Sequence, residues 1–353
     1  MTGFDRILTV NAGSTSEKVS LVNPDDGTVT FPSLDKAVAT VTPDAVAHRV
    51  VHGGARATAT WIDDAERARL EALVELAPLH QPQALSRIDR CRAVWPDVPQ
   101  AACFDTAFHA TIPPAATTYA LPERLRRLVR VYGFHGLSHE WAAARVAQAA
   151  PDARRVVVAH LGGGSSLCAI RDGTSVWTSM GFTPLDGLVM ATRSGSLDPG
   201  AVLWLAEHTD EDLTTVLEKE SGLLGLAGTA AMRELLARVA GGDADASAAL
   251  EVYVHRLVTS VGSAVAALGG LDALAFTGGI GENAGPVRRE LARRLAWLGV
   301  AVRDGDGHGD GDGCMDEPVT DLSADGASVR TLVVAAREDL QMAAQVRRLA
   351  RPS

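Results

Sequence analysis

The sequence has little that would favour a nucleic-acid or membrane partner. It carries 33 Lys and Arg residues against 43 Asp and Glu residues, which gives a formal net charge of −10. Such an acidic surface repels the phosphates of DNA, RNA and anionic lipids. The most apolar long stretch, residues 257–271, contains Thr, Ser and Gly and is too short to span a bilayer. We therefore expect neither partner, and we interpret residues 257–271 as part of a buried helix.

Cysteine is also scarce, and the first residues do not form a signal peptide. An acidic and a basic residue at positions 5 and 6 precede the first apolar run, so we expect a cytoplasmic protein. A zinc site or a redox motif typically shows closely spaced cysteine pairs, and a disulfide framework is not expected in a reducing cytosol. The four cysteines show no CxxC spacing and are expected to be small buried hydrophobes or incidental thiols: Cys91, Cys103, Cys168 and Cys314.

Lysine is rare among the basic residues, yet one lysine lies in an unusual turn. Residues 6–22, RILTVNAGSTSEKVSLV, are an apolar run, a Gly/Ser-rich turn that includes Lys18, and a second apolar run. The familiar phosphate loop has the pattern GxxxxGK[ST] and begins a helix. Because this turn leads into another strand, the sequence predicts a β-hairpin with a polar turn.

The same pattern recurs in residues 156–173, VVVAHLGGGSSLCAIRDG. Placing Gly13 over Gly162 puts Asn11 over His160, and a further strand is expected after each copy, at 28–31 and at 175–179. Glycines bring backbone N–H groups close to an anion, and serines add hydroxyl donors. The alternative is a pair of ordinary hairpin turns. We favour a duplicated α/β domain, with two such turns facing a central cleft that holds a polyphosphate.

The hydrophobic periodicity predicts alternating helices and strands along the rest of the chain. A strand is expected at 273–276, and the helix at 139–148 follows a capping residue, Ser138. Residues 303–313, RDGDGHGDGDG, are read as a flexible solvated loop and not as a calcium site, because the bidentate Glu of an EF-hand is missing. The other predicted helices are 65–76, 85–94, 211–217, 231–240, 246–268 and 342–349.

Five further stretches place polar residues between apolar strands: residues 47–54, 77–82, 103–113, 131–140 and 181–200. Any one of them has a plain structural interpretation, such as a turn histidine or a surface arginine. Together they supply two arginines, several histidines and the acid Asp105. This set suits the stabilisation of charge on a phosphoryl group in transfer.

Two stretches near the end of the chain suggest nucleotide and metal contacts. Residues 274–285, LAFTGGIGENAG, are expected to form a buried strand, a glycine-rich turn and a helix that begins at Pro286. Glycines there allow a ring or a phosphate to approach, and the helix N-terminus adds a positive dipole. Glu338 follows a strand and is a plausible magnesium ligand. An acidic helix N-terminus is the structural alternative.

At this point the motifs resemble those of a known family over nearly the whole chain. The stretches NAGSTSEK, HRVVHGG, APLHQP, FDTAFH, YGFHGLSH, TRSG, SGLLGL and GGIGEN occur in the order found in the acetokinase family, within the actin and sugar-kinase superfamily. The resemblance implies two duplicated ribonuclease-H-like α/β domains around a central cleft. It also implies reversible, direct in-line phosphoryl transfer from ATP to acetate, giving acetyl phosphate and ADP, with Mg²⁺.

The resemblance also implies residue roles. Arg49 and Arg193 would hold the carboxylate and the phosphoryl oxygens, His135 would donate to the phosphoryl group, and Asp105 would orient the attacking carboxylate, deprotonate it or hold magnesium. The implied substrate-binding residues are Asn11, Val51, Leu79, His80, Phe134 and Pro184. The implied phosphate and nucleotide contacts are Ser14, Ser16, Lys18, His160, Gly162, Gly163, Gly164, Arg233, Gly278, Gly279, Gly281 and Asn283. The implied metal ligands are Asn11 and Glu338.

The resemblance further implies two domains and a homodimer. The N-terminal domain would comprise 1–108 and 339–353 and hold the acyl group, and the C-terminal domain, 109–338, would bind nucleotide and form the dimer. Hinges are expected near 105–110 and near residue 338, with closure expelling water. The apolar helix near 250–268 is either core or interface.

The chain departs from the family pattern at three places. Gly163 stands where an Asn is usual, Ala231 stands where an Asp is usual, and the 303–313 loop lies in a normally structured region of a shorter chain. The first two changes make the phosphoryl donor an open question. Two alternatives therefore remain beside an acetate-phosphorylating enzyme: a propionate or butyrate kinase, and a non-catalytic nucleotide-binding regulatory protein.

Overall fold

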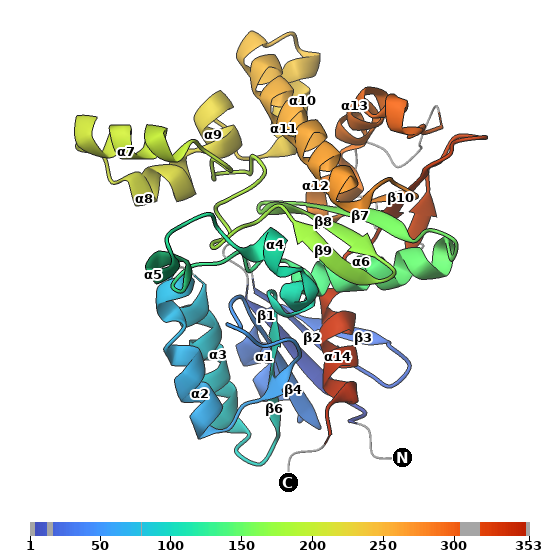
Figure 1. Cartoon of the computed structure of the whole chain (residues 1–353). Helices are drawn as coiled ribbons and strands as arrows, with labels where there is room; N and C mark the ends of the chain where they lie inside the picture. The colour runs from blue at the N-terminus through green and yellow to red at the C-terminus, as the bar shows by residue number, and fades with distance from the viewer. Residues whose placement is uncertain (1–3, 13–16, 79, 304–317, 351–353) are drawn as a thin grey trace. The chain divides into compact units, whose positions relative to one another are not determined.

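The computed structural model describes residues 4–12, 17–78, 80–303 and 318–350 (Figure 1). The expected site residues Ser14, Ser16 and Leu79 lie outside the described residues, as do Cys314 and nearly all of the 303–313 loop. The chain divides into two compact units, 1–111 with 134–141 and 337–353, and 112–133 with 142–336. The division into an acyl-binding and a nucleotide-binding domain, at the boundaries given above, stays a prediction.

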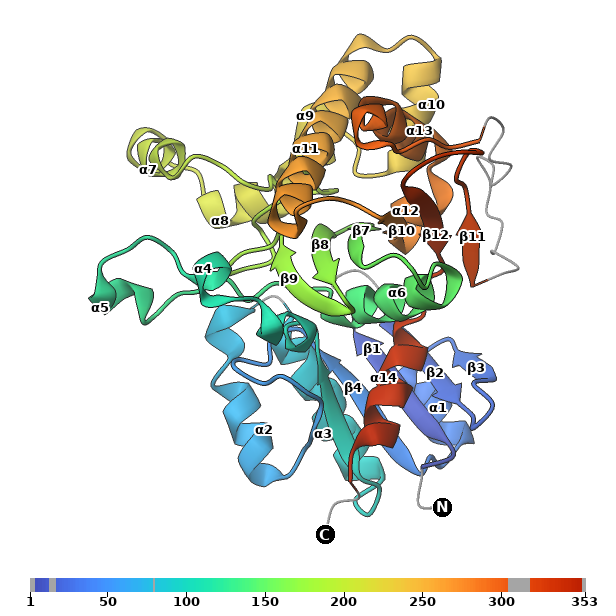
Figure 2. The same cartoon turned by 45° about the vertical axis from the view of Figure 1, so that its right-hand side comes forward.

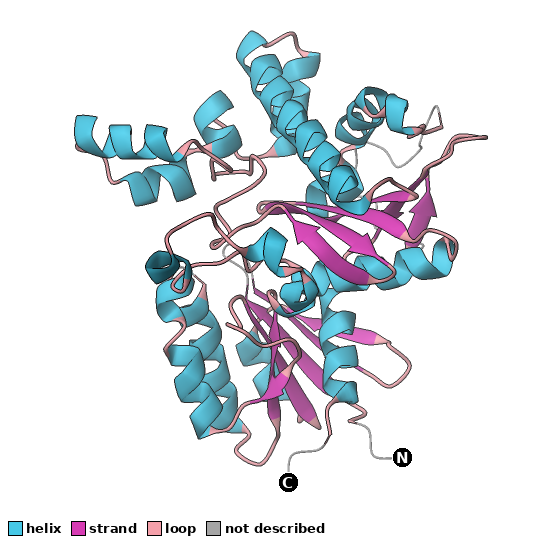
Figure 3. Cartoon of the chain, in the orientation of Figure 1, coloured by secondary structure: helices cyan, strands magenta, loops and turns pink. Residues whose placement is uncertain are grey.

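The two units contain sheets of the same topology. The first sheet has the strand order β3-β2-β1-β4-β6-β5, and the second has the order β9-β8-β7-β10-β12-β11. In both sheets a three-stranded antiparallel meander is followed by two parallel strands and one antiparallel edge strand. The predicted duplicated α/β fold is therefore confirmed, and Figure 3 shows a mixed sheet with helices in each unit.

The first unit is built on a sheet that is buried on both faces. Its elements are β1 Ile7–Ala12, β2 Glu17–Val22, β3 Thr28–Phe31, α1 Leu34–Thr40, β4 Ala45–Val50, β5 Thr60–Trp61, α2 Asp64–Glu71, η1 Val74–Leu76, α3 Gln81–Val94, β6 Gln100–Phe104, η2 Ala107–Thr111, the first residues of α6 Gly136–Ala149, and α14 Glu338–Arg348. The last helix of the chain, red in Figures 1 and 2, lies along the blue sheet of this unit.

Strand alternation separates two cores in this unit. Ile7 and Cys103 lie on the face that packs against Met342 of α14. The neighbouring residues Leu8 and Val46 lie on the opposite face, against α1 and α3. Successive side chains of a strand point to opposite faces, so the odd-numbered residues of β1, β4 and β6 share the face covered by α14. This alternation decides where the polar residues at the strand ends point.

The second unit packs its sheet against α11, a long helix. Its elements are α4 Pro114–Thr117, α5 Glu123–Arg126, most of α6, β7 Arg155–Leu161, β8 Ser165–Arg171, β9 Thr174–Thr178, α7 Pro199–His208, α8 Leu213–Thr215, the π-helical turn η3 Val216–Glu220, α9 Gly222–Ala227, α10 Met232–Ala240, α11 Ala244–Leu268, β10 Ala273–Thr277, α12 Gly278–Asn283, α13 Gly285–Arg294, η4 Ala296–Leu298, β11 Val319–Asp321 and β12 Arg330–Val334. Leu257, Val261 and Leu268 are buried in its core, so this helix contributes to the core as expected.

Several predicted elements have different bounds. The turn expected at GGIGEN is wrong: Gly278–Asn283 is a short helix, and its last carbonyls accept hydrogen bonds from the buried Arg288. Ser138 lies inside α6, which begins at Gly136, and is therefore not its cap. The helix expected at 65–76 ends at Glu71, and the helix expected at 211–217 is two short turns. Helices α1, α7 and α9 were not predicted.

Two exclusions from the sequence agree with the described part of the chain. None of its helices is long and apolar enough to cross a bilayer. Among the described cysteines, Cys91, Cys103 and Cys168 are buried and form no disulfide, and burial raises the pKa of the Cys91 and Cys168 thiols to about 12. These thiols are therefore protonated and uncharged. They act as small hydrophobic side chains in the core, as expected.

Candidate active site

Four polar side chains of the first unit meet where its parallel strands end. Asn11 is next to last in β1, Arg49 is next to last in β4, and Asp105 directly follows β6. All three carry odd numbers and so share the face covered by α14, whose first residue is Glu338. The carboxyl ends of neighbouring parallel strands are the usual place for a binding site in α/β folds.

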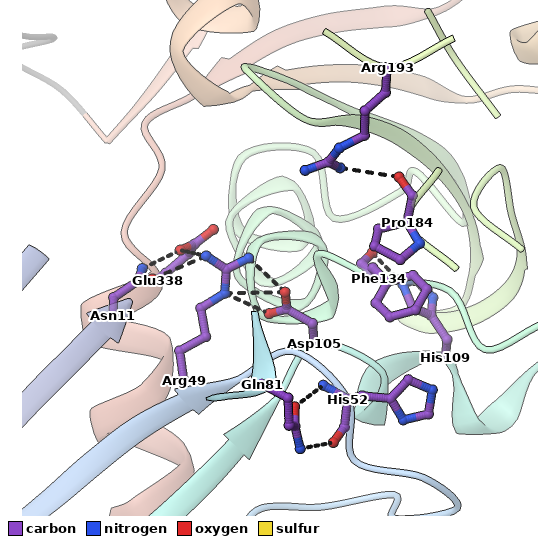
Figure 4. A network of polar contacts seen from close by, with 10 residues as sticks. All are labelled: Asn11, Arg49, His52, Gln81, Asp105, His109, Phe134, Pro184, Arg193 and Glu338. Atoms are coloured by element: carbon purple, nitrogen blue, oxygen red, sulfur yellow. Dashed lines mark hydrogen bonds and ion pairs between the residues drawn. The ribbon is translucent and has the colours of Figure 1, made fainter. Parts of the chain in front are cut away.

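Arg49 connects these residues (Figure 4). Its Nε donates to both carboxylate oxygens of Asp105 at 3.0 and 3.1 Å, and its Nη2 donates to Oδ2 at 2.6 Å. Its Nη1 donates to the Oδ1 of Asn11 at 3.1 Å and lies 4.0 Å from the Oε2 of Glu338. Asn11 Nδ2 in turn donates to that Oε2 at 2.5 Å. The guanidinium is thus held by groups from β1, the end of β6 and α14.

Burial makes the ion pair electrostatically strong. The side chains of Arg49 and Asp105 are only 14% and 2% exposed. Burial alone would lower the pKa of the Arg49 guanidinium, but Asp105 and Glu338 raise it above its usual value. Burial raises the pKa of the Asp105 carboxyl, and Arg49 opposes that rise. The Arg49 guanidinium therefore keeps its positive charge in a site with little water, where the carboxyl groups of Asp105 and Glu338 balance it. An anionic ligand would bind Arg49 in exchange for one of these partners.

The segment that contains His135 is bonded to the end of β6. The backbone N–H of Gly136 donates to the Asp105 carbonyl at 2.8 Å, and a Cβ at Gly136 would lie 2.2 Å from that oxygen. Only glycine allows this approach. His135 has a φ of 58°, in the left-handed region that non-glycine residues rarely adopt. Such an outlier is common at functional sites.

Apolar side chains expected in the substrate pocket lie in the same unit. Val51 follows β4 and is buried, and Phe134 is 1% exposed with its ring edge-on to His52 at 5.8 Å between ring centroids.

Two polar residues expected at the site also belong to the first unit. His80 precedes α3 as its N-terminal flanking residue. Lys18 is exposed and pairs across the hairpin with Asn11.

In the second unit, the structure brings the two glycine-rich motifs together. His160 is next to last in β7, matching Asn11 in β1, and pairs with Thr277 at the end of β10. Gly278 has a φ of 79°, and a Cβ there would lie 2.7 Å from the Leu161 carbonyl. Only a glycine lets α12 begin this close to β7. The equal positions of His160 and Asn11 in the first strand of each sheet agree with the predicted repeat.

Backbone in both motifs faces open space. A Cβ at Gly163 or at Gly279 would meet no atom within 4 Å. The turn around Gly162 is closed by a hydrogen bond from its N–H to the Gly164 carbonyl at 3.1 Å. Asn283 donates to the Gly279 carbonyl at 2.9 Å, and Gly281 is buried against the sheet. Exposed glycine backbone of this kind can approach phosphates closely.

Arg193 belongs to the same edge of the second unit. Its Nη1 donates to the Pro184 carbonyl at 3.1 Å, as Figure 4 shows, and the N–H of the nearby Ala191 donates to the Gly163 carbonyl at 3.2 Å. Arg233 lies exposed in the first turn of α10. That helix begins after Ala231, which offers no side-chain cap. The expected nucleotide residues of the second unit thus come from three separate segments, 160–164, 233 and 278–283.

Comparison with known proteins supports the resemblance. The sequence profile of the acetokinase family matches residues 33–344. The chain belongs to the acetokinase family. It is 43% identical over 323 residues to an acetate kinase of Clavibacter sepedonicus, covering 89% of this chain and 79% of that protein. It is 47% identical over 315 residues to an acetate kinase of Rhodopseudomonas palustris, covering 87% and 77%.

Solved structures of the family share the fold. A propionate kinase from Francisella tularensis has a TM-score of 0.86 and 33% identity over 97% of this chain and 98% of its own. An acetate kinase from Porphyromonas gingivalis has a TM-score of 0.82 and 29% identity over the same shares. The fold is therefore that of this family, within the actin and sugar-kinase superfamily.

The sequence analysis missed buried polar residues that support this acetokinase site. Gln81 is fully buried and both accepts from the His52 N–H at 3.3 Å and donates to the His52 carbonyl at 3.2 Å. Thr106 accepts from the Gly53 N–H at 3.1 Å. His109 donates to the Phe134 carbonyl at 3.0 Å. Each of these residues lies inside a motif that was singled out, yet only the fold shows that its side chain turns inward.

Three buried histidines of the first unit make its stability dependent on pH. Burial lowers the pKa of His48, His52 and His109 from 6.5 to about 4. Between pH 6.5 and 4 the unfolded chain then binds more protons than the folded chain, so acid favours unfolding. We expect the free energy of unfolding of this unit to fall by up to about 4 kcal/mol per pH unit in that window. Asp105, with its raised pKa, acts in the opposite direction.

Urea unfolding followed by circular dichroism between pH 7.5 and 4.5 checks this expectation. His48→Gln removes one titrating group and should make the pH dependence about one third shallower. His255→Gln is the matched control, because that imidazole is exposed on α11. A pH profile that is flat between 6.5 and 4.5 would contradict the assignment of neutral buried histidines.

Proposed function

We propose that this protein catalyses reversible phosphoryl transfer from ATP to acetate, giving acetyl phosphate and ADP. The observation that carries the proposal is the buried Arg49–Asp105 pair, joined to Asn11 and Glu338 at the ends of parallel strands in a member of the acetokinase family. Relatives that are 43–47% identical are acetate kinases.

The chemistry asks mainly for charge neutralisation. A carboxylate is already ionised at neutral pH, so the barrier lies in bringing two anions together in line. Guanidinium groups stay charged and bind a carboxylate or phosphate in a fork. Arg49 supplies one such group from the first unit, and Arg193 supplies one from the second. Neither residue becomes phosphorylated, and transfer is direct.

Asp105 and His135 take supporting parts in this proposal. Asp105 keeps the Arg49 guanidinium in one orientation through three hydrogen bonds and can orient the attacking carboxylate. The His135 side chain donates a hydrogen bond to the phosphoryl oxygens as their charge develops. In this proposal Val51 and Phe134 contribute an apolar wall for the methyl group of the acid, and the family resemblance assigns Pro184 the same role. His80 supports that pocket.

A magnesium ion fits the donor set of the first unit. Glu338 offers a carboxylate whose side chain is 15% exposed. Among the described residues, no group of three or more His, Cys, Asp or Glu residues could hold a metal. Mg²⁺ does not require such a group, because it uses one or two carboxylates and fills its shell with phosphate oxygens and water. The Oδ1 of Asn11 accepts from Arg49, so Asn11 ligates only if that bond is exchanged. The ion supplies charge neutralisation of the ATP phosphates.

We further propose that the second unit binds ATP. The backbone of Gly162, Gly163 and Gly164 and that of Gly278, Gly279 and Gly281 would hold the phosphates, with His160 beside them. Arg233 and Asn283 would contact the nucleoside, and Lys18, Ser14 and Ser16 of the first hairpin would contact the transferred phosphate. The open space beside Gly163 leaves room for a phosphate to approach the backbone.

Trapping the acyl phosphate tests the proposal. Hydroxylamine converts an acyl phosphate to a hydroxamate, so the purified chain is incubated with Mg²⁺, ATP and acetate, propionate or butyrate. We expect hydroxamate formation, with the highest kcat/KM for acetate; omission of ATP is the blank. A preference for propionate would indicate a propionate kinase instead. The two acids differ by one methylene, which is worth only about 1–3 kcal/mol of discrimination. No hydroxamate with any short acid would support the non-catalytic alternative.

We also propose a cytoplasmic homodimer that forms through the second unit. Helix α7 supports this, because Leu203 is 68% exposed and Trp204 is 57% exposed, and Leu197 just before it is 44% exposed. An apolar helix without a buried face is typical of an interface between subunits. Sedimentation velocity at two concentrations checks it: we expect a dimer, and a dissociated protein after Trp204→Glu. A monomeric wild type would contradict it.

A further inference from the structure

His135 is held in its left-handed conformation by hydrogen bonds on both sides. Phe134 precedes it, and the Phe134 carbonyl accepts a hydrogen bond from the Nε2 of His109 at 3.0 Å. Gly136 follows it, and the Gly136 N–H donates to the Asp105 carbonyl at 2.8 Å. The backbone of His135 itself also acts on the Asp105 carboxyl, whose pKa it lowers against the effect of burial. All of these contacts lie within the first unit. They connect the His135 segment to Asp105, at the end of β6, and to His109 in η2.

Only one of these contacts comes from a side chain outside the proposed catalytic set. His109 lies in η2 and is 1% exposed. A carbonyl oxygen can only accept, so the Nε2 of His109 carries the proton and donates it. The ring also packs edge-on to His139, with 5.7 Å between ring centroids. The imidazole is thus fixed in orientation and in tautomer.

We infer that His109 is a positioning residue for the phosphoryl-transfer reaction. Its Nε2–H fixes the Phe134 carbonyl, and this keeps the following residue, His135, in the left-handed conformation that presents its side chain to the phosphoryl group. A left-handed non-glycine residue persists only where its surroundings over-determine it. The inference rests on the proposed function, because it assigns His109 an effect on a step of that reaction.

The competing explanation is that His109 is an ordinary buried histidine that contributes only to stability. His48 provides the comparison, since it is also 1% exposed in the first unit and makes one side-chain hydrogen bond, 2.8 Å from its Nε2 to Gln100 Oε1. It lies in β4 on the face opposite to Arg49 and does not touch the His135 segment in any described contact. Loss of either ring should lower stability, but only the loss of His109 should slow the reaction.

The side-chain amides of Gln and Asn separate these explanations. The Nε2 of Gln can take the place of the Nε2 of His, whereas Asn is one methylene shorter and does not reach the Phe134 carbonyl. We expect His109→Asn to lower kcat by about tenfold or more with the KM for acetate changed less than about threefold. His109→Gln should keep kcat within about threefold of wild type. If Asn yields too little folded protein, His109→Met, which lacks a donor, replaces it with the same expectation.

A readout that does not depend on activity accompanies these kinetics. Hydrogen exchange of the Gly136 amide should quicken by about tenfold in His109→Asn and stay near wild type in His109→Gln. His48→Asn and His48→Gln should leave both kcat and this amide unchanged. In a His135→Gly background, His109→Asn should change kcat by less than about twofold, because the ring being positioned is gone.

The outcomes separate the inference from the proposed function. If wild-type enzyme yields no hydroxamate, the proposed function fails, whatever the exchange data show. If wild type is active but Asn and Gln at position 109 behave alike in kcat, whether both are fast or both are slow, the positioning role is overturned. It is also overturned if His109→Asn slows the reaction equally with and without the ring at position 135.

Discussion

Arg49→Ala is expected to lower kcat/KM for acetate by about 1,000-fold, because a preorganised charge in a buried site is removed at the point where two anions meet. Arg49→Lys should lose about 100-fold, since an ammonium keeps the charge but cannot reproduce the fork that holds Asp105 and Asn11 together. Both losses are measured with the hydroxamate assay over a range of acetate concentrations.

This substitution also leaves a buried carboxylate without its partner, so stability needs a separate measurement. Removing one member of a buried ion pair costs about 3–5 kcal/mol. Asp105→Asn in the Arg49→Ala background should therefore restore much of the thermal stability without restoring activity. Arg67→Ala is the matched control: Arg67 forms the same fork, to Asp89 at 2.8 and 2.7 Å, but with an exposed partner. If Arg49→Ala retains near-normal turnover, Arg49 has no part in catalysis.

Arg193→Ala is expected to lower kcat by about 1,000-fold while the protein stays folded. Arg193 is half-buried, and the hydrogen bond from its Nη1 to the Pro184 carbonyl contributes about 1 kcal/mol to stability. The loss should therefore be confined to the reaction. Arg193→Lys should be intermediate, because a single ammonium holds one phosphoryl or carboxylate oxygen where a guanidinium holds two.

A second arginine of the same unit serves as the control for Arg193. Arg171 donates from its Nη2 to the carbonyls of Ala267 and Leu268 at 3.1 and 2.8 Å, so it too is an arginine held by backbone oxygens. Arg171→Ala should reduce the melting temperature by a few degrees and leave kcat unchanged. Equal kcat values for the Arg193 and Arg171 variants would remove Arg193 from the proposed site.

Part of the arrangement around the site residues of the first unit follows from the sequence. The repeated hairpin predicts a duplicated sheet, and the matching of Asn11 with His160 holds because each is next to last in the first strand of its sheet. These inferences need only local periodicity and turn chemistry. The roles of Arg49 and Asp105 came from the family resemblance, and the observed pairing of β4 with β6 then places both on one face.

Other features depend on long-range packing that no local pattern contains. Glu338 meets Asn11 although 327 positions separate them, because α14 returns to the first sheet. GGIGEN has the composition of a turn, yet it is helical, since the buried Arg288 binds its last carbonyls and the start is fitted against β7. Helix α7 was missed although Asp198 before Pro199 is a readable start signal, because the helix buries no face.

The return of the last helix to the first sheet has a consequence for synthesis on the ribosome. Met342, Ala343 and Val346 are buried against strands that leave the exit tunnel hundreds of residues earlier. The second unit is therefore complete while the sheet of the first unit still exposes the apolar face that α14 will cover. The apolar face should therefore stay open to chaperones until α14 emerges, and Glu338, the proposed magnesium ligand, reaches Asn11 only after that.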